Sequence, residues 1–135
     1  MSAERAFLDT NVLLYLLSDD ARKAAQAEAL VMNGGVISVQ VLNEFANASR
    51  RKLAASWEVV HETLDILKDA LAVEPLTLET HEVALALAER YRFSIYDSLI
   101  LAAALSAGCV VVYSEDMQHG QAIGEMRVQN PFVGE

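Results

Sequence analysis

The sequence is poor in cysteine and in proline, and each shortage narrows the class of protein. Its single cysteine, Cys109, lies in an apolar run, so no disulfide can form within the chain and we expect a buried thiol. Only two prolines occur, and no linker, repeat or low-complexity stretch divides the chain. A length of 135 residues therefore predicts one domain, spanning 1–135, that is large enough to bury a core.

Long hydrophobic runs are also missing. The longest apolar stretch, 99–113, is interrupted by Ser106 and Gly108 and falls short of the roughly 18 residues of a membrane span. The first residues carry charge early and lack the layout of a signal peptide, so we expect a cytoplasmic protein with no membrane partner. A hydrophobic fraction of 53% is nevertheless high for a monomer, which is compatible with an apolar interface.

Positive charge is scarce. The chain has 19 acidic and 10 basic residues, a net charge of −9, which argues against a broad electrostatic surface for nucleic acid. Two basic clusters stand out, one at Arg50, Arg51 and Lys52 and one at Arg90 and Arg92. Each is compatible with the solvated end of a helix, where cations suit the dipole, and also with a rim that faces phosphate.

Short apolar runs alternate along the chain with segments of helical periodicity. The runs predict strands at 5–8, 36–38, 72–76, 109–113 and 126–128. The periodic segments predict helices at about 12–17, 21–32, 40–53, 57–71, 79–91 and 94–107, with further helical turns at 118–123. Such alternation favours an α/β fold, a three-layer α/β/α sandwich with a short central parallel sheet.

Four acidic residues lie where this architecture brings segments together. Asp9 follows the first predicted strand and Asp116 follows the strand at 109–113, so both lie at the carboxyl edge of the sheet. Glu44 and Asp97 lie near the starts of predicted helices, which face the same edge. Carboxylates gathered there repel one another unless a cation is bound. Hard oxygen ligands suit Mg²⁺, with Mn²⁺ as the alternative.

Each acid also has a purely structural explanation. Asp9 suits the cap of the following helix, Glu44 an exposed helical position, and Asp116 a polar loop. Asp97 follows Ser94 at the spacing of a capping box. Only the joint position of the four acids favours a metal site.

Zinc chemistry is not indicated. The three histidines, His61, His81 and His119, show no paired ligand spacing, and only one cysteine is available. His119 follows Asp116 closely, so it either borders the site or is a solvated loop histidine.

Four motifs, in this order, resemble those of PIN-domain ribonucleases, and within that family of VapC-type toxins. They are Phe-Leu-Asp-Thr-Asn at 7–11, Asn-Glu-Phe at 43–45, Tyr-Asp-Ser-Leu-Ile at 96–100 and Ser-Glu-Asp at 114–116. The resemblance covers nearly the whole chain. Asp-Thr-Asn alone is a weak signal, whereas the ordered set is specific. Many relatives have threonine in place of Ser114, which retains the hydroxyl group.

The resemblance implies a PIN-like fold and a Mg²⁺- or Mn²⁺-dependent endoribonuclease that hydrolyses phosphodiester bonds in RNA. It assigns catalysis and metal binding to Asp9, Glu44, Asp97 and Asp116. It makes Asn11 and Ser114 polar supports of the pocket. We expect Asp9 and Asp97 to be direct ligands, with Glu44 and Asp116 acting through water or orienting the nucleophile; one or two ions are both compatible with this set.

The resemblance also implies partners, namely an RNA substrate, a small antitoxin protein and a second copy of the chain in a homodimer. Arg50, Arg51 and Lys52 are the best candidates for RNA contact outside the pocket. Two alternatives remain. One is a PIN-fold RNA-processing nuclease that is not a toxin. The other is a non-catalytic acidic-pocket binding or phospho-acceptor module, although the Asp-x-Asp-x-Thr pattern of phosphatases is absent at Asp9.

Overall fold

The computed structural model describes residues 5–133 of the chain. The first four residues, on which the expectation about a signal peptide rests, lie outside the described residues. Within 5–133, no helix is both long and apolar enough to cross a membrane.

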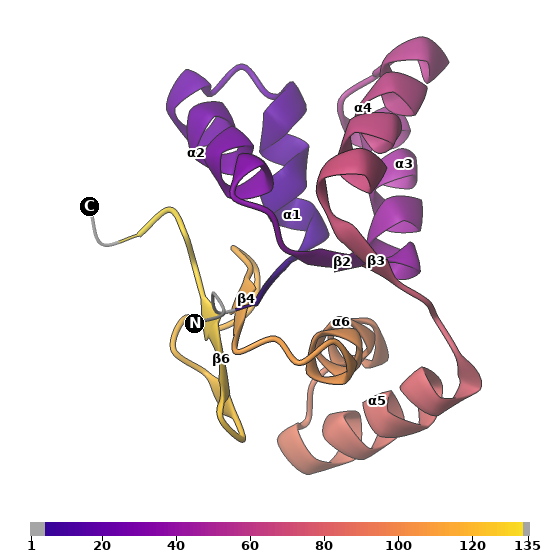
Figure 1. Cartoon of the computed structure of the whole chain (residues 1–135), viewed down its shortest axis with the longest axis vertical. Helices are drawn as coiled ribbons and strands as arrows, with labels where there is room; N and C mark the ends of the chain where they lie inside the picture. Colours follow the sequence, from indigo (N-terminus) through magenta and orange to yellow (C-terminus); the bar gives the residue numbers. More distant parts are fainter. Residues whose placement is uncertain (1–4, 134–135) are drawn as a thin grey trace.

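A six-stranded sheet forms the centre of the molecule (Figure 1), with strand order β3-β2-β1-β4-β6-β5. The strands are β1 (Ala6–Leu8), β2 (Val36–Ser38), β3 (Ala72–Glu74), β4 (Val111–Tyr113), β5 (Ala122–Ile123) and β6 (Met126–Gln129). β1 occupies a central position and pairs in parallel with both β2 and β4. The residues that follow β1 and β4 therefore emerge side by side at one edge of the sheet.

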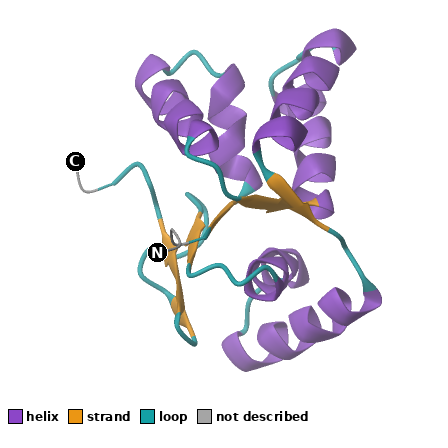
Figure 2. Cartoon of the chain, viewed as in Figure 1, coloured by secondary structure: helices purple, strands orange, loops and turns teal. Residues whose placement is uncertain are grey.

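Helices cover both faces of this sheet (Figure 2). They are α1 (Thr10–Leu13), the 3₁₀ helix η1 (Leu14–Leu17), α2 (Ala21–Met32), α3 (Val39–Lys52), α4 (Trp57–Ala70), α5 (Leu78–Tyr91) and α6 (Ile95–Ser106). Helices α1 to α4 lie on one side, and α5 and α6 on the other. This confirms the predicted α/β fold with a three-layer sandwich.

Local sequence signals set most helix starts. Asp20, Ser38, Ser56, Thr77 and Ser94 are N-caps, and each side chain accepts a hydrogen bond from a backbone N–H in the first turn of its helix. Such caps satisfy donors that a helix cannot pair internally.

The core lies between the sheet and its two helical layers. Phe7 and Val112 on the central strands and Phe45 on α3 are completely buried. Cys109 is also buried, as predicted, and its burial raises the pKa of the thiol to about 11. An inert thiol of this kind fills space rather than reacting.

The helical turns predicted at 118–123 are wrong. This segment instead contains a turn and β5, which forms an antiparallel hairpin with β6 in which Ile123 pairs with Met126. Gly120 and Gly124 adopt positive φ angles of 88° and 60°, which do not continue a right-handed helix. Burial of Ile123 and Met126 then favours the hairpin. The sheet is consequently parallel except at this edge.

Candidate functional site

The register of β1 and β4 builds the centre of the site. Leu8 pairs with Tyr113, and the Asp9 N–H donates to the Tyr113 carbonyl oxygen at 2.9 Å. Asp9 and Ser114, each the first residue after its strand, therefore face each other. The Ser114 hydroxyl donates a hydrogen bond of 2.9 Å to Asp9 Oδ2.

Asn11 ties the two strand ends together. Its Nδ2 lies 3.2 Å from Asp9 Oδ2 and 3.3 Å from Ser114 Oγ. Its Oδ1 accepts a 2.8 Å hydrogen bond from the backbone N–H of Glu115. Asn11 and Ser114 thus lie where supports of the Asp9 carboxylate would be required.

Asp9 is buried, with only 5% of its surface exposed. Burial raises the pKa of its carboxyl group to about 6, while hydrogen bonds from Ser114 and from the Thr10 N–H act in the opposite direction. The negative charges of Glu44 and Asp97 raise the pKa further. A cation bound near these three carboxylates would favour the ionised form of Asp9.

Glu44 is half-buried on α3 and is held at both oxygens. The Thr10 hydroxyl donates to Oε1 at 2.7 Å, and Gln40 Nε2 donates to Oε2 at 3.2 Å. Gln40 Nε2 also lies 3.1 Å from the Tyr96 carbonyl oxygen, which connects α3 to the start of α6. The explanation of Glu44 as an exposed helix acid is therefore wrong.

Asp97 and Asp116 form the more open side of the site. The Asp97 N–H donates to Ser94 Oγ at 3.0 Å, so Asp97 stands at the helix start that the sequence indicated. Partial burial raises the pKa of Asp97, the charge of Asp116 raises it further, and the Ser94 hydroxyl lowers it. Asp116 is exposed in the loop after β4.

All four acids line a single cleft of about 470 Å³. The remaining walls come from α1, η1, α3 and α6, and consist of Thr10, Asn11, Leu14, Asn47, Ala48, Arg51, Lys52 and Ile100. The fold thus brings together acids that are distant in sequence.

The basic cluster at the end of α3 is divided. Arg51 and Lys52 line the cleft. Arg50 does not: its guanidinium donates to the Ala55 carbonyl oxygen at 2.8 Å and lies 4.6 Å from the centre of the Trp57 ring. Arg51 follows Glu44 by two helical turns, a spacing that places both on one side of α3. That periodicity is the sequence signal that distinguishes Arg51 from Arg50.

The donor set of the cleft consists of carboxylate oxygens, which suits Mg²⁺ or Mn²⁺ rather than a softer ion. Within residues 5–133, no three His, Cys, Asp or Glu side chains stand close enough together to hold one ion directly. An ion held directly by only two of these carboxylates would keep several of its waters, which is the usual state of protein-bound Mg²⁺.

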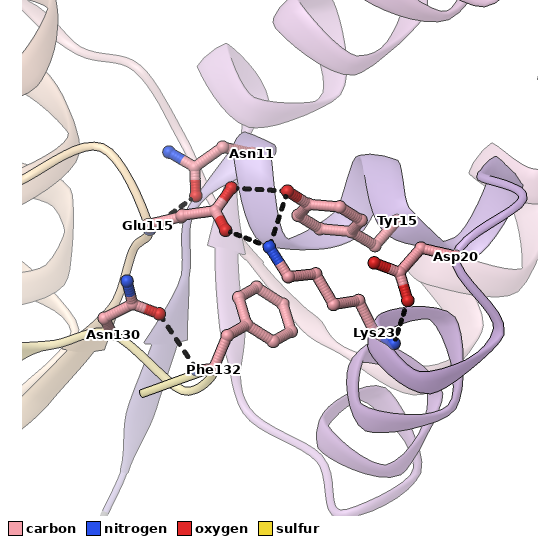
Figure 3. A network of polar contacts seen from close by, with 7 residues as sticks. All are labelled: Asn11, Tyr15, Asp20, Lys23, Glu115, Asn130 and Phe132. Atoms are coloured by element: carbon pink, nitrogen blue, oxygen red, sulfur yellow. Dashed lines mark hydrogen bonds and ion pairs between the residues drawn. The ribbon is translucent and has the colours of Figure 1, made fainter. Parts of the chain in front are cut away.

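Glu115, which the sequence did not single out, does not line the cleft, and its side chain contacts Tyr15 and Lys23 (Figure 3). Its carboxylate accepts hydrogen bonds from Lys23 Nζ at 2.7 Å and from the Tyr15 hydroxyl at 2.6 Å. The Lys23 ammonium lies 5.1 Å from the centre of the Phe132 ring. Partial burial opposes ionisation, yet the hydrogen bonds lower the pKa of Glu115. The network holds the loop between Ser114 and Asp116 from outside the cleft.

His119 does not border the site. It is exposed, and its Nδ1 accepts a 2.9 Å hydrogen bond from the Asn130 N–H. Its side chain is not among those that line the cleft. It is therefore a solvated loop histidine.

Known proteins with the same fold include bacterial toxins. The PIN domain model matches residues 6–122. No curated protein sequence matches the chain. Among solved structures, a toxin–antitoxin complex from Klebsiella pneumoniae contains a chain 20% identical to this one, with a TM-score of 0.72 and coverage of 94% of this chain and 98% of that chain.

Two further structures share the fold. VapC20 of Mycobacterium tuberculosis, a sarcin–ricin loop cleaving toxin, is 23% identical, with a TM-score of 0.69 and coverage of 90% of this chain and 98% of that one. A chain of the DNA-bound VapBC complex of Salmonella typhimurium is 20% identical, with a TM-score of 0.68 and coverage of 96% and 99%. At these identities the likeness establishes the fold.

Proposed function

This chain belongs to the PIN domain family, a family of nucleases, and on that premise we propose that it is a Mg²⁺- or Mn²⁺-dependent endoribonuclease. One observation carries the proposal. Asp9, Glu44, Asp97 and Asp116 come from four separate segments and line one cleft. Four carboxylates in one cleft repel each other, and a divalent cation relieves that repulsion.

The acids have distinct surroundings, which supports distinct roles. Asp9 is fixed by Ser114, Asn11 and the Thr10 N–H, so its oxygens are oriented before any ligand binds. We assign direct metal binding to Asp9 and Asp97, and water-mediated binding or orientation of the nucleophile to Glu44 and Asp116. When bound, the cation supplies polarisation of the scissile phosphate and a lowered pKa of its water.

Arg51 and Lys52 are the proposed phosphate contacts. Both line the cleft that holds the acids, so a strand entering it meets them next to the reacting phosphate. Arg50 is engaged by Ala55 and Trp57 and is not included. A small basic edge of this kind is compatible with the net charge of −9, because RNA would contact the protein over a limited area.

We further propose that the chain is the toxin of a toxin–antitoxin pair and forms a homodimer. The support is the likeness to the toxin–antitoxin chains described above. Leu53, Trp57 and Ile66 are exposed on α3 and α4 or between them, which leaves apolar surface for a partner.

The decisive experiment incubates a mixed RNA pool with the protein in Mg²⁺, in Mn²⁺ and in EDTA, in parallel with Asp9→Asn. We expect internal cleavage with either ion and none with EDTA or with Asp9→Asn. Asp69→Asn, an equivalent change of an exposed acid on α4, is the matched control and should cleave normally. A wild-type protein that cleaves no RNA with either ion would refute the proposal.

A toxin is distinguished from a processing nuclease in cells. Induced expression of the wild-type chain alone should arrest growth, and Asp9→Asn should not. Growth that continues normally while RNA cleavage is active in vitro would favour the processing enzyme.

A further inference from the structure

A second cavity, of about 240 Å³, adjoins the cleft. The two share Asp97 and Asp116 as common walls. Beyond those acids the second cavity is lined by Phe93, Leu101, Met117, Gln118, Gln121 and Val128. A phosphate bound beside Asp97 and Asp116 would therefore have the cleft on one side and this second cavity on the other.

The two cavities differ in chemistry. The cleft contains Arg51 and Lys52, whereas the second cavity has no basic side chain among the residues that line it. The floor of the second cavity is apolar, because it is formed by Leu101 and Val128, which are each only 1% exposed. Its remaining polar groups include the side-chain amides of Gln118 and Gln121. Apolar walls with a few placed amides suit an aromatic heterocycle and do not suit a phosphate.

We propose that the second cavity binds the base of a nucleotide next to the scissile phosphate, and that Gln118 and Gln121 contact the edge of that base. The proposal rests on the proposed ribonuclease function. It extends that function by assigning a nucleobase subsite and two residues that determine the cleavage sequence.

The size of the cavity is consistent with one base. Pockets for whole drug-sized ligands occupy about 300–1,000 Å³, and this cavity is smaller. Bases of single-stranded RNA are available for such binding, because they can leave the stack and present their edges to side chains.

The walls of the subsite are held in place. The Phe93 ring stacks on Tyr91, with ring centres 5.4 Å apart and an angle of 7° between planes. The Gln121 N–H donates to the Gln118 carbonyl oxygen at 3.2 Å, so both glutamines belong to one turn. Gln121 Nε2 donates to the Ala122 carbonyl oxygen at 3.1 Å, which restrains that side chain. An amide carries both donors and acceptors, so it can distinguish base edges.

The arrangement of the two cavities determines how the RNA strand would lie across the site. A strand whose phosphates contact Arg51 and Lys52 runs along the cleft, and the acids then lie at the next phosphate. The base on the far side of that phosphate is the one that meets Phe93 and the glutamines. Sequence preference is therefore expected at a single position adjoining the cut.

The test compares the wild type with the double variant Gln118→Leu/Gln121→Leu, which keeps side-chain bulk and removes both amides. Cleavage of a random RNA pool in Mn²⁺ is followed by sequencing of the new ends. We expect one position beside the cut to show a base preference in the wild type, and that preference to fall at least about fivefold in the double variant, the scale of one base contact.

Gln129→Leu is the matched control, because Gln129 belongs to the neighbouring strand β6 and does not line the cavity. Its cleavage pattern should equal that of the wild type. A double variant with the wild-type pattern, or a wild type without any base preference, overturns the subsite and leaves the ribonuclease function intact.

A second measurement does not depend on cleavage. Binding of the four homopolymeric oligonucleotides is measured by calorimetry in Ca²⁺, a divalent cation that also binds carboxylate oxygens, for the wild type and the double variant. We expect the wild type to prefer one base and the double variant to bind all four alike. If the wild type cleaves no RNA, this measurement still decides the subsite: equal wild-type affinity for all four oligonucleotides would overturn it.

Discussion

The two sides of the cleft are built in opposite ways. Asp9 is 5% exposed and its carboxylate accepts hydrogen bonds from three groups, whereas Asp116 is exposed in a loop. The rigid side joins two central strands of the sheet, and the open side joins a helix start to a loop. A fold can orient a carboxylate with its own donors only where burial makes those hydrogen bonds strong. On the open side, the charge of Asp116 raises the pKa of Asp97, and a bound cation would relieve this repulsion.

The largest expected difference between the two sides is in activity. Asp9→Asn should reduce RNA cleavage by about 10³-fold or more, the scale of losing a preorganised group at the reaction centre. Asp116→Asn should cost about 10–100-fold, the scale of losing a supporting group. Initial rates in Mn²⁺ measure both. Equal losses would show that the difference in burial has no catalytic consequence.

The next effect is on stability without metal. The pKa of Asp9 is about 6 in the folded protein, against 3.8 for an ordinary aspartate, which represents the unfolded chain. The folded protein therefore binds a proton at Asp9 more tightly than the unfolded chain does. The contribution of the Asp9 carboxyl group to the free energy of unfolding is therefore fully present below pH 3.8 and is lost as the pH rises through 6. Asp9→Asn should remove the dependence and be more stable than the wild type at pH 7, by on the order of 3 kcal/mol.

Denaturant unfolding in EDTA at pH 4.5 and pH 7 measures this difference. The advantage of Asp9→Asn should be large at pH 7 and small at pH 4.5. Asp116→Asn, on the exposed side, serves as the comparison and should show little change. An advantage of Asp9→Asn that is the same at both values would contradict the assigned pKa.

A smaller effect is expected at Ser114. Its hydroxyl lowers the pKa of Asp9, so Ser114→Ala should raise that pKa and move the acidic limb of the pH–rate profile upward. Activity at pH 7 should fall about 10–100-fold, as for other groups that orient a metal ligand. Ser114→Thr keeps the hydroxyl and should restore the profile. A profile unchanged by Ser114→Ala would assign the residue a packing role alone.

The smallest effect concerns the network around Glu115. Lys23→Met and Glu115→Gln should each weaken Mn²⁺ binding by a few-fold, because the loop carrying Asp116 is then held less firmly. Their ion pair is about a quarter exposed, so a large effect on stability is not expected. Calorimetric Mn²⁺ titration of the single and double variants should show non-additive losses. Lys68→Met, which breaks the exposed pair with Asp65, is the control.

The sequence predicted the strands other than β5, and the helices, because apolar periodicity is a local signal. Val111, Val112 and Tyr113 predict a buried strand from their own side chains, whatever strands lie beside them. The prediction for 118–123 failed because the structure of this segment depends on pairing with β6 and on two glycines with positive φ. Hairpin pairing is a tertiary effect that helical periodicity does not report.

For the candidate site, the sequence predicted which segments meet but not every side-chain contact. Because the carboxyl ends of parallel strands share one edge of a sheet, the strand pattern alone predicted that Asp9 and Asp116 lie together. Some side-chain detail was not accessible: His119 follows Asp116 by three positions, and only the structure shows that it does not line the cleft. The contact between Lys23 and Glu115 joins residues 92 positions apart, and neither carries a local signal of it.

The hydrogen bond between Asp9 and Ser114 spans 105 positions of the chain. Synthesis proceeds at about 5–20 residues per second, so roughly 5–20 s pass between the addition of Asp9 and the addition of Ser114. β4 must then emerge and pair with β1 before the carboxylate is oriented. A nascent chain consequently lacks a complete pocket until β4 has been synthesised. The pairing of β1 with β4 thus delays assembly of the pocket until more than 100 residues after Asp9 have been added.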